Sequence, residues 1–330
     1  MLLPCYAVFF KYKGEGGSMT RLSICLILAV VCATAACDAT VTVVVRTYDG
    51  LVVAADSRIT LTDSAGSRVA SDFGEKVKRV GRYVAVTFNG AAYLYDTETD
   101  LRSIGSLVDQ YKNQSGISDS SRTDPHSVVL GLDSLLLDLY DKHQRSNYAQ
   151  KTLQIRVCGY DSTGKRPIYQ LTYPNLREAS SKEREFDVYG SLDTIYASGV
   201  PCAYVGGQIH VWSRLIKGYD PRLLEHKWFR EVEVIVTDSL DSAVVDTTVE
   251  RKPFNPDDLR YNIRYDLMTL QDAIDFAIFI VRATIEAQRF DQNATRGVGG
   301  VIDIAVITSD GFKWLQRKRL HGEGPSELIQ

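Results

Sequence analysis

TVTVVVRTYDGLVVAADSR, residues 40–58, is the stretch that decides the fold of this chain. Its first half is dense in β-branched side chains, which favour strands. Asp49-Gly50 is a strong hairpin signal, and an apolar run with small residues follows it. The stretch therefore predicts two antiparallel strands joined by a tight turn.

The length of that turn decides which face of the second strand Asp56 occupies. A two-residue loop would set Asp56 opposite Val43, on the face away from Thr40. A three-residue loop over residues 48–50, with its glycine left-handed, would set Asp56 opposite Thr42, on the face that carries Thr40. We predict the three-residue loop.

The rest of the chain is expected to alternate between blocks of strands and blocks of helices. Residues 62–67 are expected to form a turn. Strands are predicted at 77–80, 83–88, 153–160, 167–173, 189–197, 301–308 and 312–316, and helices at 91–113, 125–145, 201–217 and 270–289. Helices grouped between sets of strands argue against βαβ units and favour antiparallel sheets packed face to face. The predicted class is α+β, a four-layer αββα sandwich with two antiparallel sheets between helix layers.

Residues 218–268 do not fit this order. They are rich in charge and proline, with strand-like pieces at 232–236 and 244–249. We interpret them as an insertion between the last two helices. Residues 40–330 then form one domain that carries this insertion.

Composition and charge exclude several classes of function. The chain has 330 residues, 45% hydrophobic and 24% charged, and its formal net charge is -3. This is ordinary globular composition, and nothing in the charge indicates a nucleic-acid partner. Cys158 and Cys202 are the only cysteines after residue 37, and no Cys/His cluster has zinc-site spacing. No metal and no cofactor are expected.

Residues 1–39 have the pattern of a secretory signal peptide or propeptide. A short positive start at Met19, an apolar run over 22–36 and small residues follow one another, and residues 1–18 read as an extension upstream of the true start. The run is shorter than the roughly 20 residues needed to span a bilayer. Export to the periplasm is the expected location. A lipid anchor at Cys37, a buried N-terminal helix and a cytoplasmic location stay open as alternatives.

Several segments along the chain resemble proteasome β-subunits and their bacterial relatives, which are N-terminal-nucleophile hydrolases. The order of the segments carries the resemblance more than any single one does. It covers Thr40 to about Leu315, apart from the insertion and residues 174–188, and Asn89 departs from the small residue usual in the family. The matching segments are residues 40–58, Glu75-Lys76-Val77, Thr87-Phe88-Asn89-Gly90, Ala197-Ser198-Gly199 and residues 299–308.

The resemblance implies that Thr40 is a nucleophile activated by its own α-amine. A threonine hydroxyl is a poor nucleophile unless a base takes its proton. A free α-amine has a pKa of about 7.7–8.0, whereas an amide nitrogen cannot serve as the base. Thr40 must therefore become the first residue, through signal-peptide cleavage after Ala39 or through self-cleavage.

The resemblance also assigns roles around Thr40. Lys76 matches the catalytic lysine, whose charge would lower the pKa of the amine and stabilise developing negative charge. Asp56 matches its partner carboxylate. Gly90 matches the glycine whose N–H faces the oxyanion, and Ser198 matches a serine near the amine. Taken alone, Asp56 and Lys76 could equally form a structural ion pair.

Further residues are expected to support the site or depart from the family pattern. Arg58 is expected to hold nearby backbone or a carboxylate, and Thr42 shares the face of Thr40. Thr295 and Val298 stand where the family usually has an aspartate and a serine. Thr295 can still form a hydrogen bond, whereas the side chain of Val298 cannot.

The function that follows from the sequence is a threonine-type peptidase or amidase that works through an acyl-ester on Thr40. A non-catalytic structural or assembly subunit, in which Thr40 stays within a peptide bond, is the main alternative, and a small-amide acylase is another. The expected substrate is a peptide or unfolded protein. The resemblance implies a homo-oligomeric ring, and export implies the absence of an ATPase partner.

Overall fold

The structure, a computed structural model, describes residues 40–63, 66–95, 101–145, 152–173, 185–189, 200–219, 231–237, 247–253, 259–290 and 296–318. The predicted leader at residues 1–39 lies outside these ranges.

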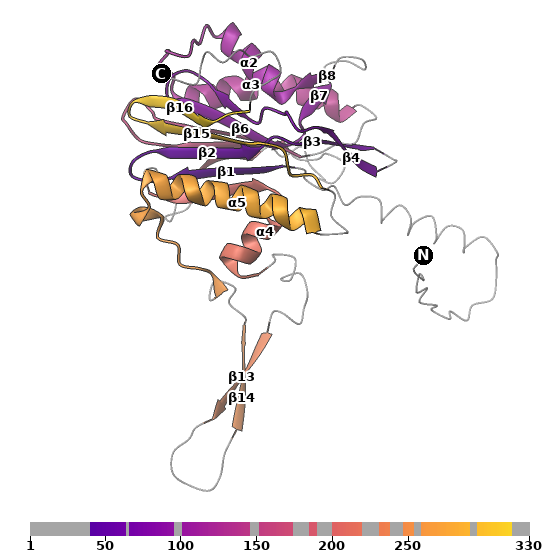
Figure 1. The fold of residues 1–330 in the computed structure, drawn as a ribbon, viewed down its shortest axis with the longest axis vertical. Coiled ribbons are helices and arrows are strands. Elements are labelled where there is room, and N and C mark those ends of the chain that lie inside the picture. The colour runs from indigo at the N-terminus through magenta and orange to yellow at the C-terminus, as the bar shows by residue number, and fades with distance from the viewer. Residues whose placement is uncertain are drawn as a thin grey trace, which may run out of the picture. The chain divides into compact units, whose positions relative to one another are not determined.

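The first sheet joins the beginning and the end of the described chain. Its five strands lie in the order β12-β1-β2-β15-β16, and every neighbouring pair is antiparallel. The strands are β1 (Val41–Arg46), β2 (Leu51–Asp56), β12 (Cys202–Gly207), β15 (Ile302–Thr308) and β16 (Gly311–Gln316). Figure 1 shows the indigo β1 and β2 in one sheet with the yellow β15 and β16.

The second sheet is built from the middle of the chain. Its five strands lie in the order β11-β10-β9-β6-β5, again with antiparallel neighbours. The strands are β5 (Val77–Arg79), β6 (Val84–Gly90), β9 (Leu153–Gly159), β10 (Ile168–Tyr173) and β11 (Glu185–Tyr189).

Three two-stranded hairpins complete the described β structure. They pair β3 (Ile59–Asp63) with β4 (Gly66–Ser71), β7 (Tyr93–Tyr95) with β8 (Leu101–Ser103), and β13 (Glu231–Thr237) with β14 (Thr247–Pro253).

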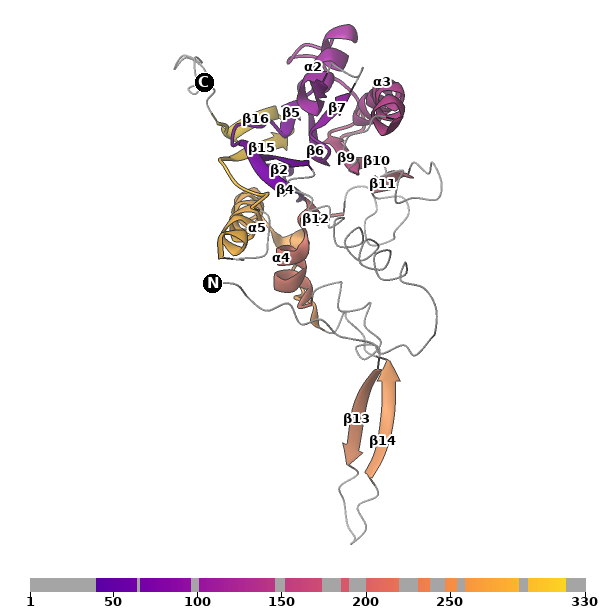
Figure 2. The ribbon, with the colours of Figure 1, turned by 90° about the vertical axis from the view of Figure 1, so that its right-hand side faces the viewer.

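Helices pack against each of the two sheets. The described helices are α2 (Ile104–Gln114), α3 (Pro125–Arg145), α4 (His210–Trp212), the π-helical η1 (Ser213–Lys217), the 3₁₀ turn η5 (Tyr265–Leu267) and α5 (Leu270–Phe290). The first sheet contacts α5 through β1, β2 and β15, and the second contacts α3 through β9 and β10. Figure 2 shows α5 on the side of the first sheet and α2 and α3 on the side of the second.

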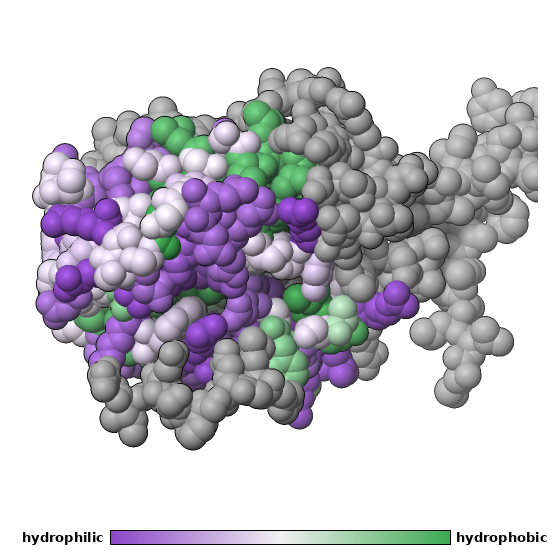
Figure 3. Space-filling model, turned by 90° about the horizontal axis from the view of Figure 1, so that it is seen from above, coloured by the Kyte–Doolittle hydropathy of each residue, from purple (hydrophilic) through white to green (hydrophobic). Residues whose placement is uncertain are grey.

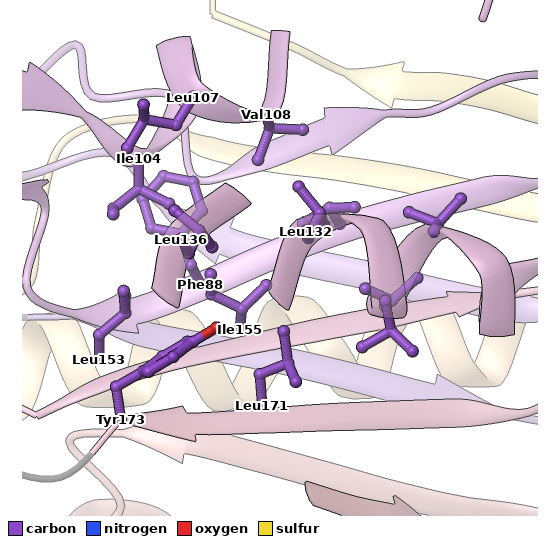
Figure 4. Close-up of a cluster of buried hydrophobic side chains, with 14 of the residues drawn as sticks. Phe88, Ile104, Leu107, Val108, Leu132, Leu136, Leu153, Ile155, Leu171 and Tyr173 are labelled. Atoms are coloured by element: carbon purple, nitrogen blue, oxygen red, sulfur yellow. The ribbon is translucent and has the colours of Figure 1, made fainter. Parts of the chain in front are cut away.

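Three hydrophobic clusters hold these elements together. One lies between the second sheet and the helices α2 and α3, where Leu107 and Leu136 meet Ile155 and Tyr173 (Figure 4). The second lies between the first sheet and α5, and the third between the two sheets. The described chain is thus mixed α and β with antiparallel sheets. Its assignment to the αββα class of N-terminal-nucleophile hydrolases stays a prediction.

The outer surface above α2 and α3 is mainly hydrophilic, with small apolar patches among the polar residues (Figure 3). Among the described residues, no helix combines the length and the hydropathy that a bilayer crossing requires.

The predicted register of the first hairpin is wrong. Arg46 pairs with Leu51, and Thr47 N–H donates to Gly50 O at 2.9 Å, so the loop consists of Tyr48 and Asp49. The Thr47 hydroxyl organises this turn, because it accepts hydrogen bonds from the N–H groups of the two residues that follow Tyr48. Neither register considered from the sequence occurs, since Thr42 pairs with Ala55 and Asp56 follows opposite Val41.

Gly50 is not left-handed, contrary to the prediction. The glycine is required for a different reason, since a Cβ there would lie 2.6 Å from Ile307 O on the neighbouring strand β15. A close approach between strands therefore explains this glycine.

Other predicted elements also differ from the structure. Of the described residues within the predicted helix 91–113, only 104–113 are helical, because Ser103 caps α2 and the strands β7 and β8 come before it. The predicted turn at 62–67 falls within the β3–β4 hairpin. A strand occupies 185–189, and residues 190–197 of the strand predicted at 189–197 lie outside the described ranges. The predicted helix 201–217 begins with the strand β12, which covers the open edge of β1.

Candidate active site

The carboxylate of Asp56 joins four segments of the chain. Its Oδ1 accepts hydrogen bonds from Val41 N–H at 3.0 Å and from Lys76 Nζ at 2.9 Å. Its Oδ2 accepts from Gly299 N–H at 3.0 Å and from Arg58 N–H at 3.2 Å. Asp56 is fully buried. Four hydrogen-bond donors on one buried carboxylate hold it in one orientation.

The local backbone explains how Asp56 reaches Lys76 from this register. Asp56 is the last residue of β2, and both Ser57 N–H and Arg58 N–H donate to Gly299 O, at 3.1 and 2.9 Å. The chain therefore leaves the sheet ladder directly after Asp56. The contact expected between Asp56 and Lys76 is present, although the register that we used to predict it is not.

Lys76 is a buried cation directly before β5, with 3% of its surface exposed. Burial lowers the pKa of Lys76, because a charged ammonium is poorly solvated there, and Asp56 opposes this effect. The positive charges of Lys318 and Arg58 lower the pKa further. Lys76 is thus a lysine whose charge state depends on its buried neighbours.

Thr40 lies where the ends of three strands converge. It is buried and directly precedes β1, and its carbonyl oxygen accepts a hydrogen bond from Gln208 N–H at 2.7 Å. Gly207 has a φ of +80°, and a Cβ on it would lie 1.9 Å from Thr40 O and 3.5 Å from Asn89 Cβ. Thr40, Gly207 and Asn89 are therefore neighbours, and Gly90 is the residue after Asn89.

Gly90 cannot be replaced without strain. Its φ is +88°, and a Cβ would lie 1.8 Å from Thr152 O. Backbone geometry alone thus requires a glycine here. The predicted role of its N–H toward an oxyanion stays a prediction.

A buried arginine that we did not single out from the sequence connects the two sheets beside Thr40. Arg156, on β9, donates to the side-chain oxygens of Thr42 at 3.1 Å, Asn89 at 2.5 Å, Gln154 at 3.0 Å and Tyr204 at 2.5 Å. Its guanidinium lies 3.9 Å from the centre of the Tyr204 ring. The hydroxyl of Thr42 thus holds Arg156, and Asn89 is oriented by it. In the sequence, Arg156 is a single arginine in a largely apolar strand, and no motif or spacing there predicts a contact with the other sheet.

Arg58 holds both a carboxylate and backbone, as the sequence analysis expected. Its Nε and Nη2 donate to Asp72 at 2.6 and 3.1 Å, and its Nη1 donates to Arg296 O at 3.2 Å. The hydrogen bond to Asp72 raises the pKa of Arg58. Arg58 therefore orders the loop before β15, which also supplies Gly299 to Asp56.

Two of the predicted site residues, Ser198 and Thr295, lie outside the described residues. Val298 is buried in the hydrophobic cluster under α5, and its N–H donates to Gln288 Oε1 at 2.9 Å. The side chain of Val298 therefore contributes packing.

A cavity of about 340 Å³ borders Lys76. Apolar side chains of Ile59, Phe73, Phe88, Ala92 and Tyr93 line part of it. Its charged lining residues largely neutralise one another, because Lys78 pairs with Glu75 at 2.6 Å and with Asp109 at 2.7 Å. The cavity is thus suited to a neutral, largely apolar group next to the buried lysine.

No protein-family model matches this chain, and no curated protein matches it either. Any function must therefore be inferred from the chemistry of the site.

Proposed function

We propose that the chain is a threonine-type hydrolase of peptide or other amide bonds, with Thr40 as its nucleophile once residues 1–39 have been removed. The observation that carries the proposal is the buried Asp56 carboxylate, which binds both the N–H directly after Thr40 and the ammonium of Lys76. This contact fixes the start of β1 relative to a buried cation. An ion pair with a purely structural role would not require a hydrogen bond to the backbone N–H of Val41, next to the residue that cleavage after Ala39 would free.

The first chemical step uses the α-amine that cleavage would free. The amine takes the proton of the Thr40 hydroxyl, and Oγ1 attacks the carbonyl carbon of the amide to form a tetrahedral intermediate. The C–N bond then breaks, and the leaving amine receives the proton. Water then attacks the ester carbon and gives a proton to the α-amine. The bond between the ester carbon and Oγ1 breaks, Oγ1 takes that proton from the amine, and the acid is released.

Lys76 and Gly90 would act on the charges of this step. The ammonium of Lys76 favours the neutral, basic form of the neighbouring α-amine and stabilises negative charge on the oxygen. The N–H of Gly90, beside Asn89 and Thr40, is the group that we expect to donate to the oxyanion. Burial lowers the pKa of Lys76, and Asp56 opposes this effect by favouring the charged form.

The cavity beside Lys76 suggests the class of substrate. Its apolar lining and internally paired charges favour a peptide whose side chain before the cleaved bond is neutral. A homo-oligomeric ring is a part of the proposal that rests on the resemblance alone. Export to the periplasm rests on the signal-peptide pattern of residues 1–39, and independence from an ATPase follows from export.

A non-catalytic subunit is the second candidate. Burial of the Val298 side chain in the α5 cluster favours it, because this position offers no hydroxyl to hold the α-amine. In that case Thr40 would stay within a peptide bond.

Hydrolysis by chains with a defined first residue separates the two candidates. A removable tag exposes Thr40 as the first residue, intact mass verifies it, and a series of fluorogenic peptide amides is assayed. We expect hydrolysis only from the chain that begins at Thr40, with loss of activity in Thr40→Ala and partial activity in Thr40→Ser. A chain that retains Ala39 is the control. Activity that survives Thr40→Ala would rule out the mechanism.

A further inference from the structure

The segment after β16 is attached to the site from two sides. Lys318 is 4% exposed, its N–H donates to Asp303 Oδ1 at 2.9 Å, and its Nζ forms an ion pair with Asp303 Oδ2. The preceding residue, Arg317, donates from Nη2 to Glu75 Oε1 at 2.8 Å. Residues 317 and 318 therefore bind β15 on one side and the segment that contains Lys76 on the other.

The strand register places this ion pair beside the site pair. Asp303 pairs with Ala55, the residue before Asp56, across β15 and β2. Lys76 follows Glu75, which Arg317 binds. The two buried aspartate–lysine pairs, Asp56–Lys76 and Asp303–Lys318, are thus linked twice. Asp303 pairs with the residue before Asp56, and the residue before Lys318 binds the residue before Lys76.

We propose that Lys318, held by Asp303, is a positioning residue that sets the charge state of Lys76. A like charge near a buried ammonium disfavours its protonated form, and the low dielectric of the interior extends the range of this effect. The catalytic meaning of the inference rests on the proposed function. The electrostatic coupling itself does not.

Other charged groups also affect the pKa of Lys76, and the effect of Lys318 adds to theirs. Asp56 raises its pKa, Arg58 lowers it, and Asp72 lies close enough to feel the charge of Lys76 in turn. Lys318 adds to the lowering, while Asp303 fixes its position and partly compensates its charge. Of the two cations that lower the pKa of Lys76, Lys318, unlike Arg58, neither bonds Asp56 nor orders the loop before β15.

The pH profile of hydrolysis tests the proposal. Lys76 acts as a cation, so activity is present below its pKa and is lost as the pH rises through it. Lys318→Met removes a positive charge and leaves a carboxylate, so the alkaline limb should move to higher pH by roughly half a unit. Lys318→Arg keeps the charge and should leave the limb in place. Lys313→Met removes an exposed charge of β16 and serves as the matched control.

A double variant distinguishes electrostatics from packing. Asp303→Asn with Lys318→Met removes both charges together, so the limb should return close to its wild-type position even if stability falls. The proposal is overturned if the alkaline limb of Lys318→Met stays at its wild-type pH. It is also overturned if the double variant moves the limb as far as Lys318→Met alone does.

A second comparison covers the case in which Lys318→Met does not fold. In the Asp303→Asn background, Lys318→Arg and Lys318→Met both replace Lys318 by a long side chain, but only Lys318→Arg keeps the charge, since arginine remains protonated when buried. The arginine variant should show its alkaline limb at lower pH, and equal limbs would overturn the inference.

A direct readout separates this inference from the proposed function. The Nζ resonance of Lys76, assigned by its absence in Lys76→Arg, is titrated by NMR in isotope-labelled protein. A titration that shifts with Lys318→Met in a protein without hydrolytic activity supports the coupling and rejects the hydrolase. Hydrolysis by a protein in which Lys318→Met does not shift the Lys76 titration supports the hydrolase and rejects the coupling.

Discussion

Asp56 is the residue on which the site depends most, because four donors from four parts of the chain meet on its carboxylate. An asparagine has one acceptor oxygen, so it cannot accept from Val41 and Lys76 on one side and from Gly299 and Arg58 on the other.

We predict that Asp56→Asn is both unstable and inactive. Breaking a buried ion pair at one partner leaves an uncompensated charge and costs about 3–5 kcal/mol. Denaturant unfolding should show this loss. The matched control is Asp72→Asn, which breaks the partly exposed pair with Arg58 and should cost about 1 kcal/mol or less. Equal losses in the two variants would show that the Asp56–Lys76 pair is not exceptional.

Glu75 gives a prediction about stability against pH. Burial alone would raise its pKa, but hydrogen bonds from Lys78 and Arg317 lower it from 4.5 to about 2. A lowered pKa in the folded state stabilises the protein above pH 4.5, and this stabilisation is lost as the pH falls toward about 2. Glu75→Gln should therefore lose about 1 kcal/mol at pH 7 and nothing at the acid end.

Urea unfolding of both proteins between pH 7 and pH 2 measures this difference. Glu286→Gln removes a carboxylate of an exposed i,i+3 pair and should change stability by less than about 0.5 kcal/mol. A Glu75→Gln loss that does not vary with pH would contradict the prediction.

At the residue scale, the sequence predicted which residues meet and not how. Asp56 and Lys76 were identified from their motifs, and they are in contact. The register failed because the Thr47 hydroxyl, and not the Asp49-Gly50 dipeptide, organises the turn. With two hydrogen bonds to this hydroxyl, every cross-strand pair of the hairpin differs from the predicted one.

At the scale of elements, Arg156 connects β9 to strands β1, β12 and β6 around Thr40. Its planar fork makes several fixed hydrogen bonds at once, which a lysine cannot reproduce. We predict that Arg156→Lys loses about 2–3 kcal/mol of unfolding free energy, measured in urea. Arg289→Lys, on the exposed end of α5, is the control and should lie within about 0.5 kcal/mol of wild type. A similar stability for both variants would mean that the inter-sheet contact is weak.

The cavity gives a second prediction at this scale. Lys78 on β5 pairs with Glu75 and with Asp109 on α2, and these contacts raise its pKa although burial alone would lower it. Lys78→Met removes the cation that pairs with both Asp109 and Glu75, and leaves Glu75 with its second partner, Arg317. If the chain hydrolyses peptides, the ratio of kcat/KM for basic over neutral side chains should rise about tenfold. An unchanged ratio would place substrate side chains elsewhere.

Elements with local signals were predictable, and those that depend on distant partners were not. The residues of α3 and most of α5 follow from helical periodicity alone. The strand β12 exists because β1 offers an open edge, with Thr42 opposite Gly206 and Thr40 O bonded to Gln208. No pattern within residues 201–217 reports such a partner. Arg156 was missed for the same reason.

At the scale of the whole molecule, the first sheet is built from strands at opposite ends of the described chain. β2 lies between β1 and β15, and its apolar residues are fully buried against both neighbours. The hairpin β13–β14 differs, because its described strands form a sheet of their own. Folding of the site should thus depend on residues 302–316 and not on residues 231–253.

Two deletions test this division. Replacing residues 231–253 by a short Gly-Ser linker removes β13 and β14 together, so no pairing in either large sheet is broken. We expect the variant to unfold cooperatively within about 4 °C of the wild-type Tm and to keep whatever activity the parent has.

Ending the chain at residue 300 removes β15 and β16, and with them Ile304, Ala305 and Ile307 from the buried clusters. It also removes both members of the Asp303–Lys318 ion pair and exposes the edge of β2. That chain should show no cooperative unfolding transition in calorimetry, whereas loss of the transition in the hairpin deletion would mean that the insertion belongs to the folding core.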